Sequence, residues 1–127
     1  MRRGLLAAMV AMLCLLAACN TASDFAPNAY KALSAAGVTY DAIMKTAATA
    51  YQNKQITDEQ KTAIVKYGDA FQGSYNLAVV ALEEYVAAKN ATGSTDTSKA
   101  ISALMDVASR LSELQGYAAP ILNLKGN

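Results

Sequence analysis

Three long stretches of this 127-residue chain repeat their apolar residues in steps of three and four, which is the spacing of one face of an α-helix. A helix with such a face must bury it against another element. No strand segment competes with these stretches, and no Asn-Gly or Asp-Gly hairpin turn occurs. The sequence therefore predicts an all-α fold.

The first stretch predicts a helix over about 27–52. Pro27 suits the first turn of this helix, where its missing N–H has no partner to lose. The polar residues 53–55 end the pattern. The predicted inward face consists of Ala26, Tyr30, Leu33, Gly37, Tyr40, Met44, Ala47 and Tyr51, widened by Ala36, Ile43 and Ala50.

The second stretch predicts a helix over about 58–90. It begins with a capping-box pattern, in which the Thr57 hydroxyl accepts a free amide and Gln60 reaches back to it. Gly68 and Gly73 interrupt the apolar face, so two helices with a break at Gly68 are the alternative. The apolar phase continues through both glycines, which favours one helix. Its predicted inward face consists of Ile64, Tyr67, Phe71, Tyr75, Ala78, Leu82, Tyr85 and Ala88.

The third stretch predicts a helix over about 97–119, with Asp96 or Thr97 as its cap. We expect Pro120 to kink or end it, because proline removes a backbone donor and crowds the preceding turn. Residues 90–98 form the clearest loop of the chain. The predicted inward face consists of Ile101, Leu104, Ala108, Leu111, Leu114, Ala118 and Ile121.

Short loops between long helices make those helices antiparallel neighbours. The expected fold is therefore an antiparallel, up-down-up three-helix bundle over residues 28–127. In this arrangement the second loop lies at the end where the first helix begins. We expect a modest core, because glycine and alanine contribute little apolar area.

The beginning of the chain has the features of an export signal. Met1-Arg2-Arg3 is followed by fourteen uncharged residues, 5–18, which is shorter than the 20 or so that a membrane-spanning helix needs. The run ends in Leu16-Ala17-Ala18-Cys19. These four residues resemble the lipobox of bacterial lipoproteins. An ordinary signal peptide followed by a chance cysteine is the alternative.

The resemblance implies cleavage after Ala18, a diacylglycerol on the Cys19 thiol and an N-acyl chain on the new amino group. It also implies outer-membrane sorting in a diderm host, because Asn20 and not aspartate follows the cysteine. We predict a cleaved signal peptide over 1–18 and a lipidated, polar tether over 19–27. Cleavage removes two of the eleven basic residues and leaves nine against ten acidic, so the lipid must supply the membrane anchor.

The composition argues against several classes of function. The near-balance of charge does not fit a nucleic-acid partner, whose phosphates require a basic patch. The chain has no histidine, and cysteine occurs only at positions 14 and 19. The usual general bases, thiolate nucleophiles and zinc ligands are therefore missing from the predicted mature chain. We expect no enzyme, no metal and no cofactor besides the covalent lipid.

Tyrosine is the unusual residue, with seven tyrosines against two phenylalanines. Rings at the edges of the core are the simplest interpretation, with each hydroxyl reaching water or backbone. An exposed row would instead mark a docking face, and a third interpretation is the lining of a cavity for an apolar ligand. The candidate interaction face consists of Tyr30, Tyr40, Tyr51, Tyr67, Tyr75 and Tyr85.

The sequence thus predicts a small, lipid-anchored protein of the bacterial cell envelope that acts as a non-catalytic interaction or structural module. Its expected partners are the membrane, through the lipid, and another envelope protein. One alternative is a carrier of a small apolar ligand or lipid within the bundle. A phage- or plasmid-type exclusion or lysis lipoprotein is the other alternative.

Overall fold

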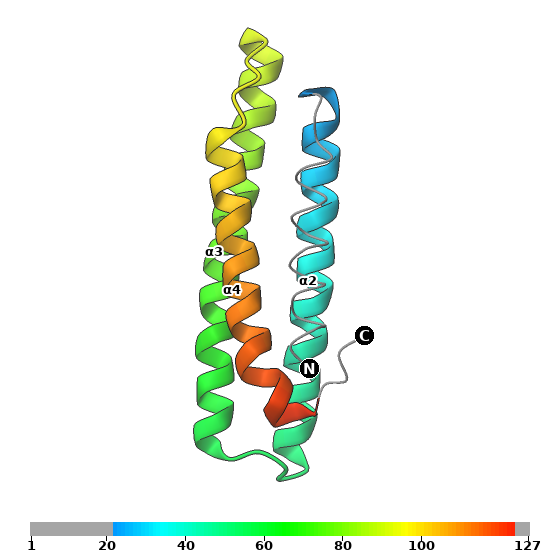
Figure 1. Ribbon diagram of the computed structural model, residues 1–127, viewed down its shortest axis with the longest axis vertical. Coiled ribbons are helices and arrows are strands. Elements are labelled where there is room, and N and C mark those ends of the chain that lie inside the picture. Colours follow the sequence, from blue (N-terminus) through cyan, green and yellow to red (C-terminus); the bar gives the residue numbers. More distant parts are fainter. Residues whose placement is uncertain (1–21, 124–127) are drawn as a thin grey trace.

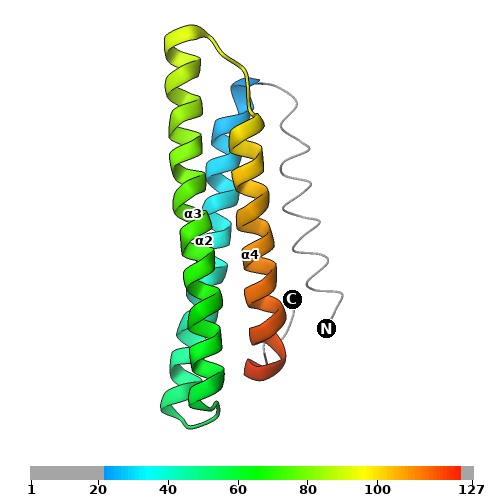
Figure 2. The ribbon, with the colours of Figure 1, turned by 90° about the vertical axis from the view of Figure 1, so that its left-hand side faces the viewer.

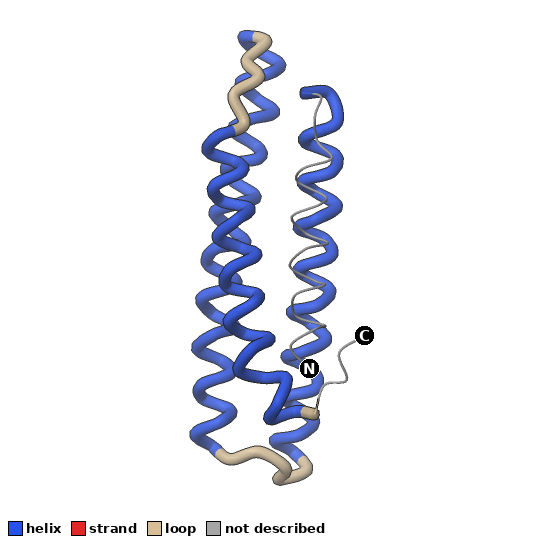
Figure 3. Tube along the Cα trace, in the orientation of Figure 1, coloured by secondary structure: helices blue, strands red, loops and turns tan. Residues whose placement is uncertain are grey.

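The computed structural model describes residues 22–123, which form three helices named α2 (Ala22–Gln52), α3 (Asp58–Thr92) and α4 (Ser98–Leu122). Consecutive helices are antiparallel, running down, up and down in the view of Figure 1, and this part of the chain contains no strand (Figures 1 and 3). The predicted all-α three-helix bundle is confirmed. The signal peptide predicted over 1–18 and the lipidation site Cys19 lie outside the described residues.

The second loop, residues 93–97, lies at the same end of the bundle as the start of α2, as the sequence predicted (Figure 2). The first loop, residues 53–57, lies at the opposite end. No helix within 22–123 combines the length and the apolar character that crossing a membrane requires.

Helix α3 runs unbroken through both glycines, which excludes a break at Gly68. The predicted capping box is present at its start. The backbone N–H of Gln60 donates to the Thr57 hydroxyl at 3.1 Å, and the Gln60 side chain accepts from the backbone N–H of Thr57 at 2.9 Å. The helix extends to Thr92 and ends at Gly93, whose φ of 69° lies in the left-handed region that glycine adopts without strain.

Helix α2 begins at least five residues before the predicted start, so residues 22–27 are helical and are not a tether. The cause is Phe25, which is only 2% exposed and packs edge-on against Tyr85 of α3, with ring centroids 5.1 Å apart. Burial of this ring holds an additional turn and a half of helix against the bundle. Pro27 therefore lies inside the helix and not in its first turn.

The buried face of α2 is rotated by about one residue from the predicted one. Tyr30 and Tyr51, expected to point inward, are exposed, while Ala26, Gly37, Tyr40 and Met44 are half-buried. Alanines lie on the buried face of α2 and also on both of its flanks, so the apolar pattern alone did not show which of these neighbouring faces is buried. The buried face of α2 consists of Phe25, Ala29, Ala32, Leu33, Ala36, Ile43, Ala47 and Ala50.

Helix α2 ends in the first loop at a residue with left-handed backbone conformation. Lys54 has a φ of 58°, and the N–H of the next residue, Gln55, donates to the carbonyl of Ala50 at 2.8 Å. This is a Schellman motif with lysine at the position that usually holds glycine. Ile56 follows and is 6% exposed, so the loop adds a side chain to the core that the helical pattern did not predict.

Helix α4 continues beyond Pro120 to Leu122, so the proline does not end it. Figure 1 shows the last turns of α4 directed away from the line of the rest of the helix, in agreement with a kink. At the other end, Thr97 is the N-cap residue but makes no side-chain capping bond. The carboxylate of Asp96 accepts from the N–H of Ser98 at 3.0 Å instead.

Helices α3 and α4 approach each other more closely than α2 approaches either of them. Small and polar contacts join α3 to α4. The hydroxyl of Ser74, 6% exposed, donates to Asp106 at 2.6 Å, and Lys99 pairs with Glu84. Aromatic rings also lie between α2 and α3, where Phe25 packs against Tyr85 and Tyr40 stacks on Phe71. The surface is hollowed along the seam between α2 and α3.

Candidate functional site

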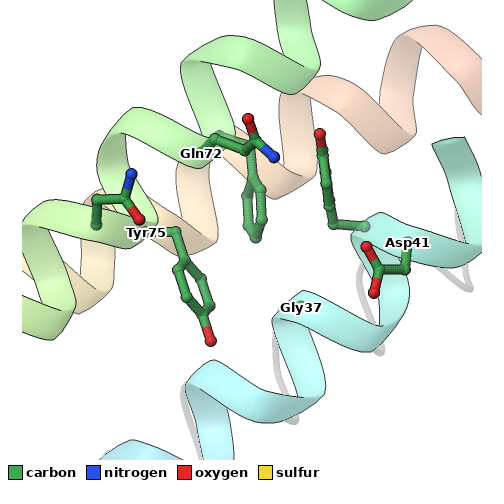
Figure 4. A pocket seen from close by; sticks show the side chains of 7 residues that line it. Gly37, Asp41, Gln72 and Tyr75 are labelled. Atoms are coloured by element: carbon green, nitrogen blue, oxygen red, sulfur yellow. The ribbon is translucent and has the colours of Figure 1, made fainter.

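A surface hollow that combines aromatic with acidic and amide side chains lies halfway along the seam between α2 and α3 and has a volume of about 380 Å³. We call it the aromatic hollow. Figure 4 shows Tyr75 extending from α3 toward Gly37 on α2, with Asp41 on α2 and Gln72 on α3 across the hollow. The lining residues are Gly37, Tyr40, Asp41, Phe71, Gln72, Tyr75 and Asn76.

Three rings form the apolar part of this hollow. Tyr40 stacks on Phe71 with centroids 4.9 Å apart and an angle of 17° between the planes, and Tyr75 lies 5.8 Å from Phe71 at 43°. Phe71 is 1% exposed, so it fixes the other two rings from the core side. Gly37 makes room for Tyr75, because a Cβ there would lie 3.7 Å from that ring and a longer side chain would enter the hollow.

The polar part of the hollow is acidic. Burial raises the pKa of the Tyr40 hydroxyl, and the negative charges of Asp69 and Asp41 raise it further, while Gln72 offsets part of the shift. Of the seven lining side chains none is basic. The hollow therefore offers ring faces, a carboxylate and two amides, which are groups that can bind another molecule.

Two further hollows continue along the same seam toward the first loop. Met44 lines the second hollow. Its side chain packs beside Gly68, where an added Cβ would lie 3.2 Å from the Met44 sulfur. The second hollow, about 190 Å³, is lined by Met44, Ala47, Ala48, Tyr51, Gln52, Lys61, Ile64 and Val65. The third, about 440 Å³, lies at the loop and is lined by Tyr51, Gln52, Lys54, Ile56, Thr57 and Asp58.

Tyr51 stands between these last two hollows with both ends of its side chain engaged. Its hydroxyl donates to Asp58 at 2.8 Å, and the ammonium group of Lys61 lies 4.3 Å from the centroid of its ring. The hydrogen bond to Asp58, together with the charge of that carboxylate, raises the pKa of Tyr51. An acid, an aromatic ring and a cation thus already combine once in this seam.

The six tyrosines proposed from the sequence do not share one face. Tyr40 and Tyr75 meet in the aromatic hollow, whereas Tyr67 packs against Tyr117 of α4 with centroids 5.2 Å apart. Tyr85 is 5% exposed and belongs to the core, so it is not part of any surface.

Tyr30 is 41% exposed and Tyr51 36%, and neither lines the aromatic hollow. Edge-of-core rings are therefore the interpretation that fits Tyr40, Tyr67 and Tyr75, which are half-buried.

Sequence reasoning missed the other members of the aromatic hollow. Gly37 and Phe71 were assigned to the core faces, and Asp41 was not singled out as a site residue. Gln72 and Asn76 drew no attention. One feature of the sequence could have indicated the hollow: Gly37 and Asp41 lie one turn apart on the flank of a helix that also carries Tyr40.

Among residues 22–123, no three aspartate or glutamate side chains lie close enough to hold a metal ion. No family model matches this chain, and neither a curated protein nor a solved structure shows significant similarity to it.

Proposed function

We propose that this chain is a lipid-anchored, non-catalytic binding module of the bacterial cell envelope, which holds another envelope protein against the aromatic hollow. The observation that carries the proposal is the hollow itself, which is open to solvent and combines three packed rings with acidic and amide groups. Aromatic anchors with a polar rim are typical of protein-binding surfaces.

The openness of the hollow favours a protein partner over a carried ligand. Carriers enclose most of the surface of their ligand. Here the centre of the bundle is filled by side chains such as Leu82, Leu104 and Leu114, which have no exposed surface. The three hollows lie at the surface seam, where a segment of a partner can enter and leave.

The position of the hollow suits an envelope partner. With the lipid on Cys19, the three residues to Ala22 span at most about 10 Å. Gly37 lies fifteen residues further along α2, which is about 22 Å of helix. The hollow would then face proteins that rise a few tens of ångströms from the same membrane, the outer membrane in a diderm host.

The proposal is tested by co-purification of the full chain from native membranes, with identification of retained proteins by mass spectrometry. Gly37→Leu fills the hollow, whereas Gly73→Leu places the same side chain on α3 in open space, where a Cβ meets no atom within 4 Å. We expect one specific envelope protein to be retained by the wild type and by Gly73→Leu and lost with Gly37→Leu. Equal retention by both variants would refute the docking role.

The anchor is tested on the same preparation. The intact mass of the mature chain should correspond to residues 19–127 plus diacylglycerol and one acyl chain. Cys19→Ala should release the chain from the membrane fraction. A mass without acyl chains would refute the anchor.

A further inference from the structure

The aromatic hollow carries negative charge, and none of the residues that line it is a cation. Asp41 lines it, and Asp69 is close enough to act on the hydroxyl of Tyr40. The sequence places Lys45 one turn beyond Asp41, but no ion pair joins these two residues in the structure. By contrast, the equally spaced Asp106 and Arg110 form an ion pair, with 3.8 Å between Asp106 Oδ1 and Arg110 Nε. The hollow is thus complementary to a positively charged group.

Elsewhere in the same seam, a tyrosine and an aspartate already have a cation beside them. At the first loop, Tyr51 bonds to the carboxylate of Asp58 and receives the ammonium of Lys61 over its ring. The aromatic hollow also contains a tyrosine and an aspartate, Tyr40 and Asp41, although no hydrogen bond joins these two, and none of its lining side chains supplies a cation.

We propose that the aromatic hollow receives the guanidinium group of an arginine side chain on the protein partner, an assignment that rests on the proposed function. A guanidinium is planar, so it stacks on a tyrosine ring while its N–H groups bond to a carboxylate and to amide oxygens. Tyr75, Asp41, Gln72 and Asn76 supply those groups. The openness of the hollow favours an arginine presented by a protein surface over a free cation, which would stay largely solvated.

The assignment is tested by NMR titration of the full chain in maltoside micelles, whose neutral headgroups do not compete. Ethylguanidinium is the probe, and N-ethylurea, of nearly the same shape but uncharged, is its control. We expect ethylguanidinium at millimolar concentration to shift the amide signals of residues 37–41 and 72–76, and N-ethylurea to leave them in place. Equal shifts with both compounds would overturn the cation assignment.

A charge-removing variant makes the test specific. Asp41→Asn should weaken ethylguanidinium binding by about three- to fivefold, the effect of losing one partly solvated charge pair. Glu59→Gln removes one charge from the exposed first turn of α3, away from the hollow, and should leave binding unchanged. Equal weakening by both variants would mean that net charge and not the hollow attracts the probe.

The two proposals fail separately. Partner loss in Gly37→Leu without any response to ethylguanidinium would overturn the arginine and leave docking in place. A specific ethylguanidinium response, with partner retention that does not depend on Gly37, would overturn the docking role and leave a cation site.

Discussion

Gly68 on α3 lies against the side chains of Met44 and Tyr40 on α2, and its replacement by alanine should test how the seam is packed. A Cβ at this position would lie 3.2 Å from the sulfur of Met44, 3.3 Å from its methyl group and 3.3 Å from Cε2 of Tyr40. All three distances are shorter than normal contacts. Met44 can move its flexible end, but the ring of Tyr40 is held by its stack on Phe71.

Two opposing terms set the magnitude. Alanine is about 1 kcal/mol more favourable than glycine inside a helix. Forcing an additional methyl group into a packed interface costs about 1–3 kcal/mol. The free energy of unfolding of Gly68→Ala should therefore lie between that of the wild type and about 2 kcal/mol below it. Gly73→Ala, in open space on the same helix, should keep the whole gain and be stabilised by about 1 kcal/mol.

Urea unfolding followed by circular dichroism measures both variants under identical conditions. We expect Gly68→Ala to be at least about 1 kcal/mol less stable than Gly73→Ala, a difference of about 4–8 °C in Tm for a domain of this size. Equal stabilisation by the two substitutions would refute the tight packing of Met44 and Tyr40 against Gly68.

Three further outcomes follow from single residues. Phe25→Ala should lower the free energy of unfolding by about 3 kcal/mol, because a buried ring and its contact with Tyr85 are lost; a neutral result in urea unfolding would mean that residues 22–27 are a tether after all. Lys54→Gly should raise the urea midpoint, with a gain of about 1 kcal/mol, because its φ of 58° is strained for lysine; a lower midpoint would contradict this. The pKa of Asp96 is lowered, chiefly because its carboxylate accepts a hydrogen bond from the backbone N–H of Ser98. The contribution of this carboxylate to the free energy of unfolding is therefore present above its ordinary pKa of 3.8 and is lost as pH falls through the lower pKa of the folded state. Asp96→Ala should therefore destabilise the chain at pH 7, with a penalty that shrinks in strong acid, and a penalty independent of pH would refute the role of the carboxylate.

Local signals in the sequence were sufficient for the number, order and direction of the helices. The capping box at Thr57 depends on neighbouring residues only, and so does the stop at Gly93. The inward face of α3 was largely correct because large side chains such as Ile64, Phe71 and Leu82 mark it clearly.

Features that depend on distances between helices were not predictable in the same way. The inward face of α2 consists mainly of alanines, which also occur on its flanks, so its rotation is set by the partners of Phe25 and Tyr40 on α3. The aromatic hollow depends on which side chains of α2 and α3 meet along the seam. Gly68 was recognised as an interruption, but the tight space around it can be seen only once Met44 is known to lie opposite.

The most direct test of the account is site-specific photocrosslinking of the full chain in its native host. A benzophenone amino acid replaces Tyr75 in the aromatic hollow or Leu77, which is 67% exposed and does not line it. The account predicts a covalent adduct at position 75 with the envelope protein that Gly37→Leu loses, and no such adduct at position 77. An adduct with that protein at position 77 alone, or at neither position, would contradict it.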